Sequence, residues 1–419
     1  MDQYLWIGGV VIVGLVVLQV LWLAFDTIRG IAHGHAQRKL EAQLLQQRVA
    51  AAGKQRLAEE QKSAAWAGWR KFTVARKQLE DPDKQVCSFY LEAHDGKPIA
   101  PFEPGQFLTF QLNVPGQSKP LVRCYSLSDG PRPDHYRVSI KRVPAPRNVP
   151  DAPPGMASNF FHDQINEGDL LDVKAPGGHF YLDTANDRPV VLIGGGVGIT
   201  PVLSMLNTIT ASGGNRETWF FLGVRHSGEH PLKEHLENIA RDHPNVHLQI
   251  CYSNPKDSDQ AEVDYQHAER VSVDLFKRLL PSCNYDFYMC GPPPMMDSLV
   301  EDLAAWGVPS EKVHLEKFGP GAGRKVKKPV DPEATGPEVV FKKSGKSVRW
   351  DRNAEHLWEF AAANEVRIDS GCLEGNCGTC LTAILSGEVE YTKQIGFECE
   401  ERTCLVCCCV PKGPLELDT

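Results

Sequence analysis

Cysteines gather near the C-terminus, and three of them have the spacing of iron ligands. Eight of the thirteen cysteines lie between residues 372 and 409. Cys372, Cys377 and Cys380 form a Cys-x4-Cys-x2-Cys pattern, which is the spacing of three ligands of a [2Fe-2S] cluster. The glycines between them let backbone N–H groups point at the sulfur atoms. A zinc site and unligated thiols are the alternatives, and we favour the cluster.

The fourth cluster ligand is not fixed by this spacing. The later cysteines that compete for it are Cys399, Cys404, Cys407, Cys408 and Cys409. Because the cysteines fit a metal site better than a disulfide framework, we expect a reducing compartment.

A second group of residues that could do chemistry is Arg123-x-Tyr125-Ser126, which follows a strand-like run at residues 106–121. An arginine can hold a phosphate through its planar guanidinium, and a tyrosine ring can lie on another ring system. A serine hydroxyl can bond a ring nitrogen. Together these side chains suit a flavin site, although the same residues also suit an ordinary strand end.

A glycine-rich loop at residues 194–201 follows the fully apolar run 189–193, which is typical of a buried parallel strand. The loop predicts a pyrophosphate site at the start of a helix, with a threonine cap and Pro201 in the first turn. Its spacing is not Gly-x-Gly-x-x-Gly, so the loop alone does not establish a dinucleotide fold. The residues concerned are Gly195, Gly196, Gly198 and Thr200.

Two shorter motifs are ambiguous. Gly155 and Ser158 precede an apolar helical turn, where they suit either a phosphate site or simple helix capping. Cys290, Gly291 and Pro292 follow the last apolar strand, at the edge of a parallel sheet where ligands bind. An inert buried cysteine is the alternative for Cys290.

The elements that position these motifs predict a multidomain protein. Short strands at 72–75, 86–93, 107–112 and 136–143 predict an antiparallel β-barrel over residues 67–184, with a β-sandwich as the alternative. Strands at 189–193, 219–224, 246–252 and 286–290, with helices between them, predict an α/β domain with a parallel sheet over 185–318. Residues 319–336 are rich in glycine, proline and lysine and are expected to be a linker. A hairpin and the helix 354–364 predict an α+β domain over 337–419.

The N-terminus carries an apolar run, residues 4–25, without a charged side chain. As a helix it is about 33 Å long, enough for one bilayer crossing. We therefore predict a transmembrane anchor over residues 1–30 and a helical stalk over 31–66. For the anchor the alternatives are a cleaved signal peptide and a buried core helix, and for the stalk the alternative is an amphipathic surface helix. Basic residues after the run put the N-terminus outside and the catalytic domains in the cytoplasm of a bacterial-type inner membrane. The net charge of −8 makes nucleic acid an unsuitable partner.

Residues 69–318 resemble the ferredoxin-NADP reductase superfamily, most closely the reductase half of flavohaemoglobins. The motifs that carry the resemblance are Trp-Arg-x-Phe at residue 69, Arg-x-Tyr-Ser at 123, Gly-x-x-Ser at 155 and Asp-Phe-Tyr-x-Cys-Gly-Pro at 286. The resemblance implies that Arg123 holds the flavin phosphate, Tyr125 stacks on the isoalloxazine and Ser126 bonds near N5. It also implies that Gly155 and Ser158 bind the flavin pyrophosphate, and it favours FAD over FMN.

The same resemblance assigns the remaining site residues. The nicotinamide nucleotide would be bound by Gly195, Gly196, Gly198 and Thr200. The hydride-transfer pocket would be lined by Cys290, Gly291, Pro292, Glu316 and Phe318, with Ser126, Cys290 and Glu316 as catalytic residues. NADH is favoured over NADPH because Glu229 lies where a 2'-phosphate would be placed, whereas Arg225 favours the opposite choice.

Residues 339–419 resemble plant-type ferredoxins, which have a β-grasp fold. The family ending Leu-x-Cys-x-x-x-Pro matches Leu405, Cys407 and Pro411, which selects Cys407 as the fourth ligand. One departure is Leu373, where many relatives carry arginine.

The module order resembles the reductases of aromatic-ring oxygenases, although the predicted anchor departs from that pattern. Hydride from NADH brings two electrons, a [2Fe-2S] cluster accepts one, and a flavin can bridge the difference. We therefore expect an NAD(P)H-dependent oxidoreductase for electron transport that serves a membrane-bound partner protein. That partner would be an oxygenase, hydroxylase or desaturase. The alternative is the electron-input subunit of a respiratory NADH:quinone reductase.

Overall fold

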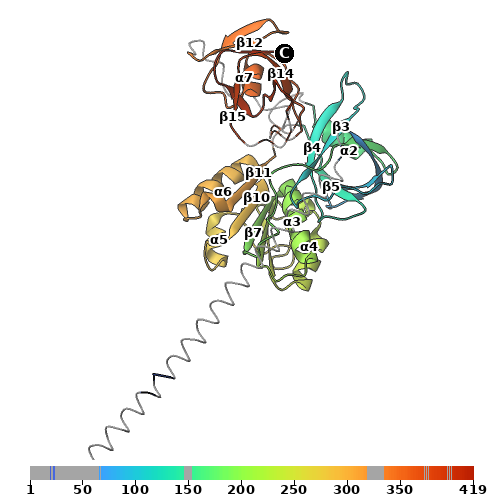
Figure 1. Ribbon diagram of the computed structural model, residues 1–419. Coiled ribbons are helices and arrows are strands. Elements are labelled where there is room, and N and C mark those ends of the chain that lie inside the picture. The colour runs from blue at the N-terminus through green and yellow to red at the C-terminus, as the bar shows by residue number, and fades with distance from the viewer. Residues whose placement is uncertain are drawn as a thin grey trace, which may run out of the picture. The chain divides into compact units, whose positions relative to one another are not determined.

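The computed structural model describes residues 66, 68–145, 153–318, 335–371, 373, 375, 377–393, 395, 397 and 399–419, together with Gln19, Trp22 and Leu23. The chain divides into two compact units, Met1–Glu59 and Glu60–Thr419. The elements labelled in Figure 1 belong to the second unit.

The predicted anchor and stalk lie outside the described residues, apart from Gln19, Trp22 and Leu23, which are helical, and Trp66, whose indole N–H donates to the Val173 carbonyl at 3.0 Å. Among the helices that the structure describes, none combines the length and the apolar character needed to cross a bilayer. Most of the predicted linker, residues 319–334, also lies outside the described part.

The first domain is a six-stranded antiparallel sheet with the order β4-β3-β6-β1-β2-β5. A bridge between Leu127 and Val138 joins the two edges of this sheet, so it closes towards the predicted barrel. The helix α2 (Met156–Asp163) covers it, and Phe161 of α2 packs edge-on against Phe89 and Phe110. The strands are β1 (Arg70–Leu79), β2 (Val86–Ala93), β3 (Phe107–Leu112), β4 (Leu121–Ser126), β5 (Tyr136–Lys141) and β6 (Leu170–Val173).

The second domain is a five-stranded parallel sheet with the order β11-β10-β7-β8-β9. Its strands are β7 (Val190–Gly195), β8 (Thr218–Val224), β9 (Val246–Tyr252), β10 (Asp286–Gly291) and β11 (Val313–Lys317). Its helices are α3 (Ile199–Ala211), α4 (Lys233–Asp242), α5 (Val273–Leu279) and α6 (Pro293–Ala305).

Both faces of this sheet are covered, which explains the continuous apolar run in β7. Val190 and Leu192 belong to the core formed with α3 and α4. Val191 and Ile193 belong to the core formed with α5 and α6. Successive side chains of a strand point to opposite faces, so a sheet between two helical layers needs apolar residues at every position. Figure 1 shows the two helical layers on either side of β7. The predicted doubly wound α/β domain is therefore confirmed.

The third domain is an α+β unit around one helix, α7 (Leu357–Ala363). Its larger sheet has the order β13-β12-β18-β14-β16, and β15 pairs with β17. The helix is capped by His356, whose Nδ1 accepts the Glu359 N–H at 3.1 Å. The strands are β12 (Glu338–Phe341), β13 (Lys346–Arg349), β14 (Leu381–Ser386), β15 (Val389–Tyr391), β16 (Thr403–Leu405), β17 (Cys409–Pro411) and β18 (Leu415–Leu417).

The N–H of Trp358 in α7 donates to the Val406 carbonyl at 2.8 Å. This bond fixes the helix to the segment that carries Cys407, the predicted fourth ligand.

Close packing between β10 and the glycine-rich loop leads to a testable expectation. A Cβ at Gly198 would lie 2.1 Å from the Cys290 carbonyl oxygen, whereas a Cβ at Gly214 would meet only Ser212 Oγ at 3.6 Å. A clash with backbone cannot be relieved by turning a side chain. Gly198→Ala should therefore destabilise the domain by roughly 1–3 kcal/mol, and Gly214→Ala should not. Calorimetric unfolding of the two variants checks this, and equal transitions would refute the packing argument.

Candidate functional site

Tyr125 occupies a fixed, half-buried position on β4. Its ring lies edge-on to Phe110, with centroids 5.8 Å apart, and to Phe161, at 5.3 Å. Such edge contacts hold an aromatic ring in one orientation. Burial raises the pKa of Tyr125, so the hydroxyl remains neutral. The ring is therefore positioned to serve as a stacking surface.

Arg123 lies two residues earlier on the same face of β4, because strand side chains alternate. Its guanidinium donates to the Val122 carbonyl at 2.7 Å. Burial lowers the pKa of Arg123, yet among the described residues no carboxylate forms an ion pair with it. A half-buried cation without an acidic partner fits a phosphate group, so this part of the site fits FAD.

The start of α2 differs from the prediction for Ser158. The N-cap position is Gly155, and Ser158 lies inside the first turn. The Ser158 hydroxyl donates to the Gly155 carbonyl at 3.0 Å and accepts the Val143 N–H at 3.1 Å. It therefore fastens the helix to the chain after β5. A phosphate at this helix would meet backbone N–H groups of the first turn, which have no acceptor within a helix.

Ser126, Cys290 and Glu316 come together at the junction of two domains. The Ser126 hydroxyl donates to Glu316 Oε2 at 3.2 Å. Cys290 on β10 pairs in register with Glu316 on β11. Cys290 is completely buried, and this burial, followed by the charge of Glu316, raises the pKa of its thiol. The thiol thus stays neutral beside the carboxylate. Phe318 follows β11 directly and is half-buried.

The glycine-rich loop is built differently from the prediction. The expectation that Thr200 caps α3 is wrong, because the N-cap is Gly198 and the Thr200 hydroxyl donates to the Val197 carbonyl at 3.1 Å. A Cβ at Gly195 would lie 2.7 Å from Pro292 Cδ, so this glycine serves loop packing. Gly196 has φ +55° and open space beside it. Gly196 is therefore the point where a ligand can approach the backbone, as a nicotinamide nucleotide requires.

The cluster loop brings cysteine sulfurs together. Cys380 Sγ lies 3.0 Å from Cys407 Sγ, and Cys407 Sγ lies 3.4 Å from Cys408 Sγ. Hydrogen bonds from the Cys380 and then the Cys408 thiol lower the pKa of Cys407, whereas the bond to Cys407 and burial raise the pKa of Cys380. Thiolates are the form that binds iron, and buried sulfurs this close together fit a [2Fe-2S] cluster. Cys372 lies outside the described residues.

The other predicted competitors have different neighbours. Cys399 Sγ lies 3.4 Å from the Tyr391 hydroxyl, and Cys409 is hydrogen-bonded with Cys404. Cys407 as the fourth ligand remains a prediction, with Cys408 as its nearest rival.

Lys174 joins the first domain to the cluster loop and was missed by the sequence analysis. Its ammonium donates to the Cys377 carbonyl at 2.8 Å and lies over the rings of Trp69 and Phe397. Its backbone N–H donates to the Thr109 carbonyl at 2.9 Å, and Thr109 pairs with Cys124 on β4. A single lysine after a short strand has no motif that would single it out.

The residues after β8 would face the ribose of a bound dinucleotide. Arg225 forms a two-pronged ion pair with Glu229, whose pKa it lowers. The Ser227 hydroxyl donates to Asp259 Oδ1 at 2.5 Å. Two groups that could bind a 2'-phosphate are therefore already occupied by carboxylates.

Three family descriptions match separate parts of the chain. Residues 71–181 match an oxidoreductase FAD-binding domain, and residues 192–301 match an oxidoreductase NAD-binding domain. Residues 341–412 match a 2Fe-2S iron-sulfur cluster binding domain.

Individual proteins resemble the chain over these same parts. A flavohaemoprotein from Halalkalibacterium halodurans is 39% identical over 264 residues, which are 62% of this chain and 63% of that protein. The chain thus spans less than two thirds of the relative's length. The flavohaem-like FAD/NAD-binding domain of a nitric oxide dioxygenase from Vibrio cholerae is 31% identical, with a TM-score of 0.53, over 60% of this chain and 100% of that domain. Phthalate dioxygenase reductase is 27% identical, with a TM-score of 0.51, over 84% of this chain and 98% of that protein.

The choice of Cys407 as cluster ligand can be tested against its neighbours. Cys407→Ser should lose most of the bound iron and the visible absorption of the cluster. Cys404→Ser, at an equally buried position, should keep both, because Cys404 lies with Cys409. Iron analysis and anaerobic absorption spectra give the answer. Retention of the cluster in Cys407→Ser together with its loss in Cys408→Ser would transfer the role to Cys408.

Proposed function

We propose that the chain is a membrane-anchored, NADH-dependent reductase of the ferredoxin-NADP reductase type with a [2Fe-2S] domain. The matches to FAD-binding, NAD-binding and 2Fe-2S domains and the likeness to phthalate dioxygenase reductase support this proposal. The reductase delivers electrons from NADH, by way of FAD and the cluster, to a membrane-bound oxygenase, hydroxylase or desaturase. When bound, FAD would accept two electrons as a hydride and pass them on one at a time.

The observation that carries the proposal is the contact between the flavin domain and the cluster loop. Lys174 donates to the carbonyl of Cys377, a predicted cluster ligand, while its own backbone bonds to β3. The strand β3 pairs with β4, which carries Arg123 and Tyr125. The predicted cluster loop is thus attached to the sheet that carries the predicted flavin residues, which supports an internal electron transfer.

At the predicted hydride-transfer site, one hydroxyl has a fixed orientation and one thiol is neutral. The Ser126 hydroxyl is oriented towards Glu316 Oε2, and the neutral Cys290 thiol adds no charge next to that carboxylate. Both Ser126 and Cys290 are buried, so water has little access to them. We infer that Ser126 and Glu316 orient the reacting rings and that Cys290 limits the space beside them.

The membrane and the partner belong to this proposal as well. The apolar run at residues 4–25 is long enough for one crossing and would hold the catalytic domains at the cytoplasmic side. The likeness to phthalate dioxygenase reductase, whose description names electron transfer from pyridine nucleotides to [2Fe-2S], supports an oxygenase-type partner. The apolar run also favours a second candidate, an electron-input subunit of a respiratory NADH:quinone reductase.

Reconstitution distinguishes the two partners. The full chain is placed in vesicles with the membrane protein that co-purifies after gentle solubilisation, and NADH oxidation is followed. An oxygenase partner predicts oxidation that depends on an organic substrate and oxygen. Oxidation that depends on a quinone and needs no organic substrate would replace the first proposal with the second.

The electron order leads to a direct expectation. Cys377→Ser should remove the cluster and abolish NADH-dependent reduction of cytochrome c, whereas ferricyanide reduction by the flavin should persist. Cys283→Ser is the control, because Cys283 is a half-buried cysteine of the NAD-binding domain. Stopped-flow and steady-state assays measure both activities. Loss of both reductions in a folded, FAD-loaded Cys377→Ser protein would contradict the order.

The preference for NADH is the second expectation. Glu229→Gln should release Arg225 from its ion pair, so the NADPH/NADH ratio of kcat/KM should rise by about tenfold, corresponding to one new phosphate contact of about 1.4 kcal/mol. Glu237→Gln, on the exposed side of α4, is the control. An unchanged ratio in Glu229→Gln would show that Arg225 does not face the 2' position.

A further inference from the structure

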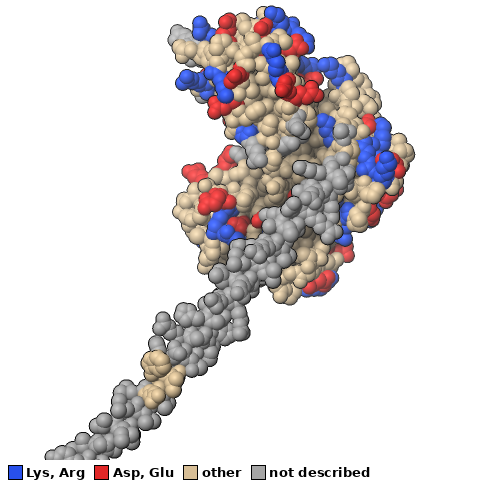
Figure 2. All heavy atoms as spheres, viewed as in Figure 1, with Lys and Arg blue, Asp and Glu red and all other residues tan. Residues whose placement is uncertain are grey.

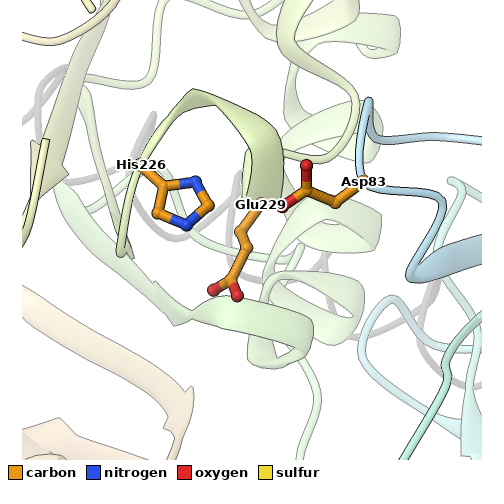
Figure 3. Close-up of side chains that lie close together, drawn as sticks. All are labelled: Asp83, His226 and Glu229. Carbon is orange, nitrogen blue, oxygen red and sulfur yellow. The ribbon is translucent and has the colours of Figure 1, made fainter. Parts of the chain in front are cut away.

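Asp83, His226 and Glu229 form a cluster of which only Glu229 has a role in the predicted nucleotide site. One potential ligand atom of each residue lies within 4.8 Å of those of the other two. Asp83 lies in the turn between β1 and β2 of the FAD-binding domain, whereas His226 and Glu229 follow β8 of the NAD-binding domain. Figure 3 shows the edge of the His226 ring that carries both nitrogen atoms facing the side where Glu229 and Asp83 lie. The cluster therefore spans two domains.

The backbone holds these residues in place. The Asp83 N–H donates to the Gly228 carbonyl at 3.0 Å, so the turn and the loop are bonded to each other. A Cβ at Gly228 would lie 2.4 Å from Asp83 Oδ1, which shows how closely the carboxylate is packed. The turn itself is fixed by Asp81, which accepts the Val86 N–H at 2.6 Å. The three side chains are thus preorganised rather than gathered by chance on a mobile surface.

The imidazole has a nitrogen that the protein leaves unsatisfied. Nδ1 of His226 is inaccessible to solvent and has no hydrogen-bond partner among the described residues. An unpaired buried polar atom is costly and calls for an explanation such as a bound ion. One imidazole and two carboxylates are a ligand set that suits Zn²⁺, with water in the remaining position.

Two side-chain cations now balance the carboxylates. Lys256 Nζ lies 3.7 Å from Asp83 Oδ1, and Arg225 pairs with Glu229. Lys256 is about half exposed, so a divalent cation could displace its flexible side chain at low cost. Glu229 can keep Arg225, because an ionised carboxylate has about four lone-pair positions. Lys256 is therefore the competitor that sets the affinity.

We infer that Asp83, His226 and Glu229 form a Zn²⁺-binding site that joins the FAD-binding and NAD-binding domains, and that Lys256 competes with the metal. This inference does not rest on the proposed electron acceptor.

Calorimetric titration of the full, FAD- and cluster-loaded protein with Zn²⁺ tests the site. The parent protein should show one site whose Kd rises at least tenfold in His226→Gln and in Asp83→Asn. Lys256→Met should lower the Kd, because the competing charge is removed. His243→Gln, a half-buried histidine outside the cluster, should leave the Kd unchanged. Any Zn²⁺ binding by the cysteines is the same in all variants, so differences in Kd between the variants report on this cluster.

Two results would overturn the inference. One is Zn²⁺ binding by Asp83→Asn and His226→Gln with the affinity and stoichiometry of the parent. The other is an unchanged or higher Kd in Lys256→Met. Asp83 lies at the surface, so Asp83→Asn gives a folded test protein even where His226→Gln fails to fold. In either case the cluster would be a network of ion pairs only.

Discussion

The structure depends on the attachment of the cluster loop to the flavin-binding sheet. The Lys174 ammonium makes this attachment at the Cys377 carbonyl, and the rings of Trp69 and Phe397 surround it. A cation between two aromatic rings and a carbonyl replaces its lost hydration with several weak contacts. The position of Lys174 in turn depends on β6, which pairs with both β1 and β3. A barrel framework thereby determines where an iron-sulfur domain can approach a flavin.

Carboxylates lie beside the hydrogen-bond donors of the loop after β8, in the NAD-binding domain. The loop after β8 offers an arginine, a histidine and a serine in sequence, a combination that would attract a phosphate. Each of them is met by an acid, namely Glu229, Asp83 and Asp259. Each donor of the loop therefore has a carboxylate nearby. The residue types of the loop alone could not predict this arrangement, because Asp83 and Asp259 are distant in sequence.

Local patterns predicted the domains well, and long-range contacts explain what they missed. The apolar run of β7 and the cysteine spacing are visible in consecutive residues, so the parallel sheet and the cluster loop were predictable. The roles of Ser158 and Thr200 were not, since the Ser158 hydroxyl accepts the Val143 N–H and the Thr200 hydroxyl donates to the Val197 carbonyl, and only the folded backbone reveals those partners. The short strands β6, β11 and β14 to β18 were also missed, because three to six residues carry little periodicity. Arg225 and Glu229 were both noticed, but only the folded structure shows that they form an ion pair with each other.

The bond from the Trp358 N–H to the Val406 carbonyl has a consequence for assembly of the iron site. Helix α7 holds the backbone next to Cys407 through contacts that contain no iron. The helix itself is secured by its His356 cap and by Leu357 and Phe360 in the core. A cluster delivered to the folded domain would therefore meet this predicted ligand already held in place.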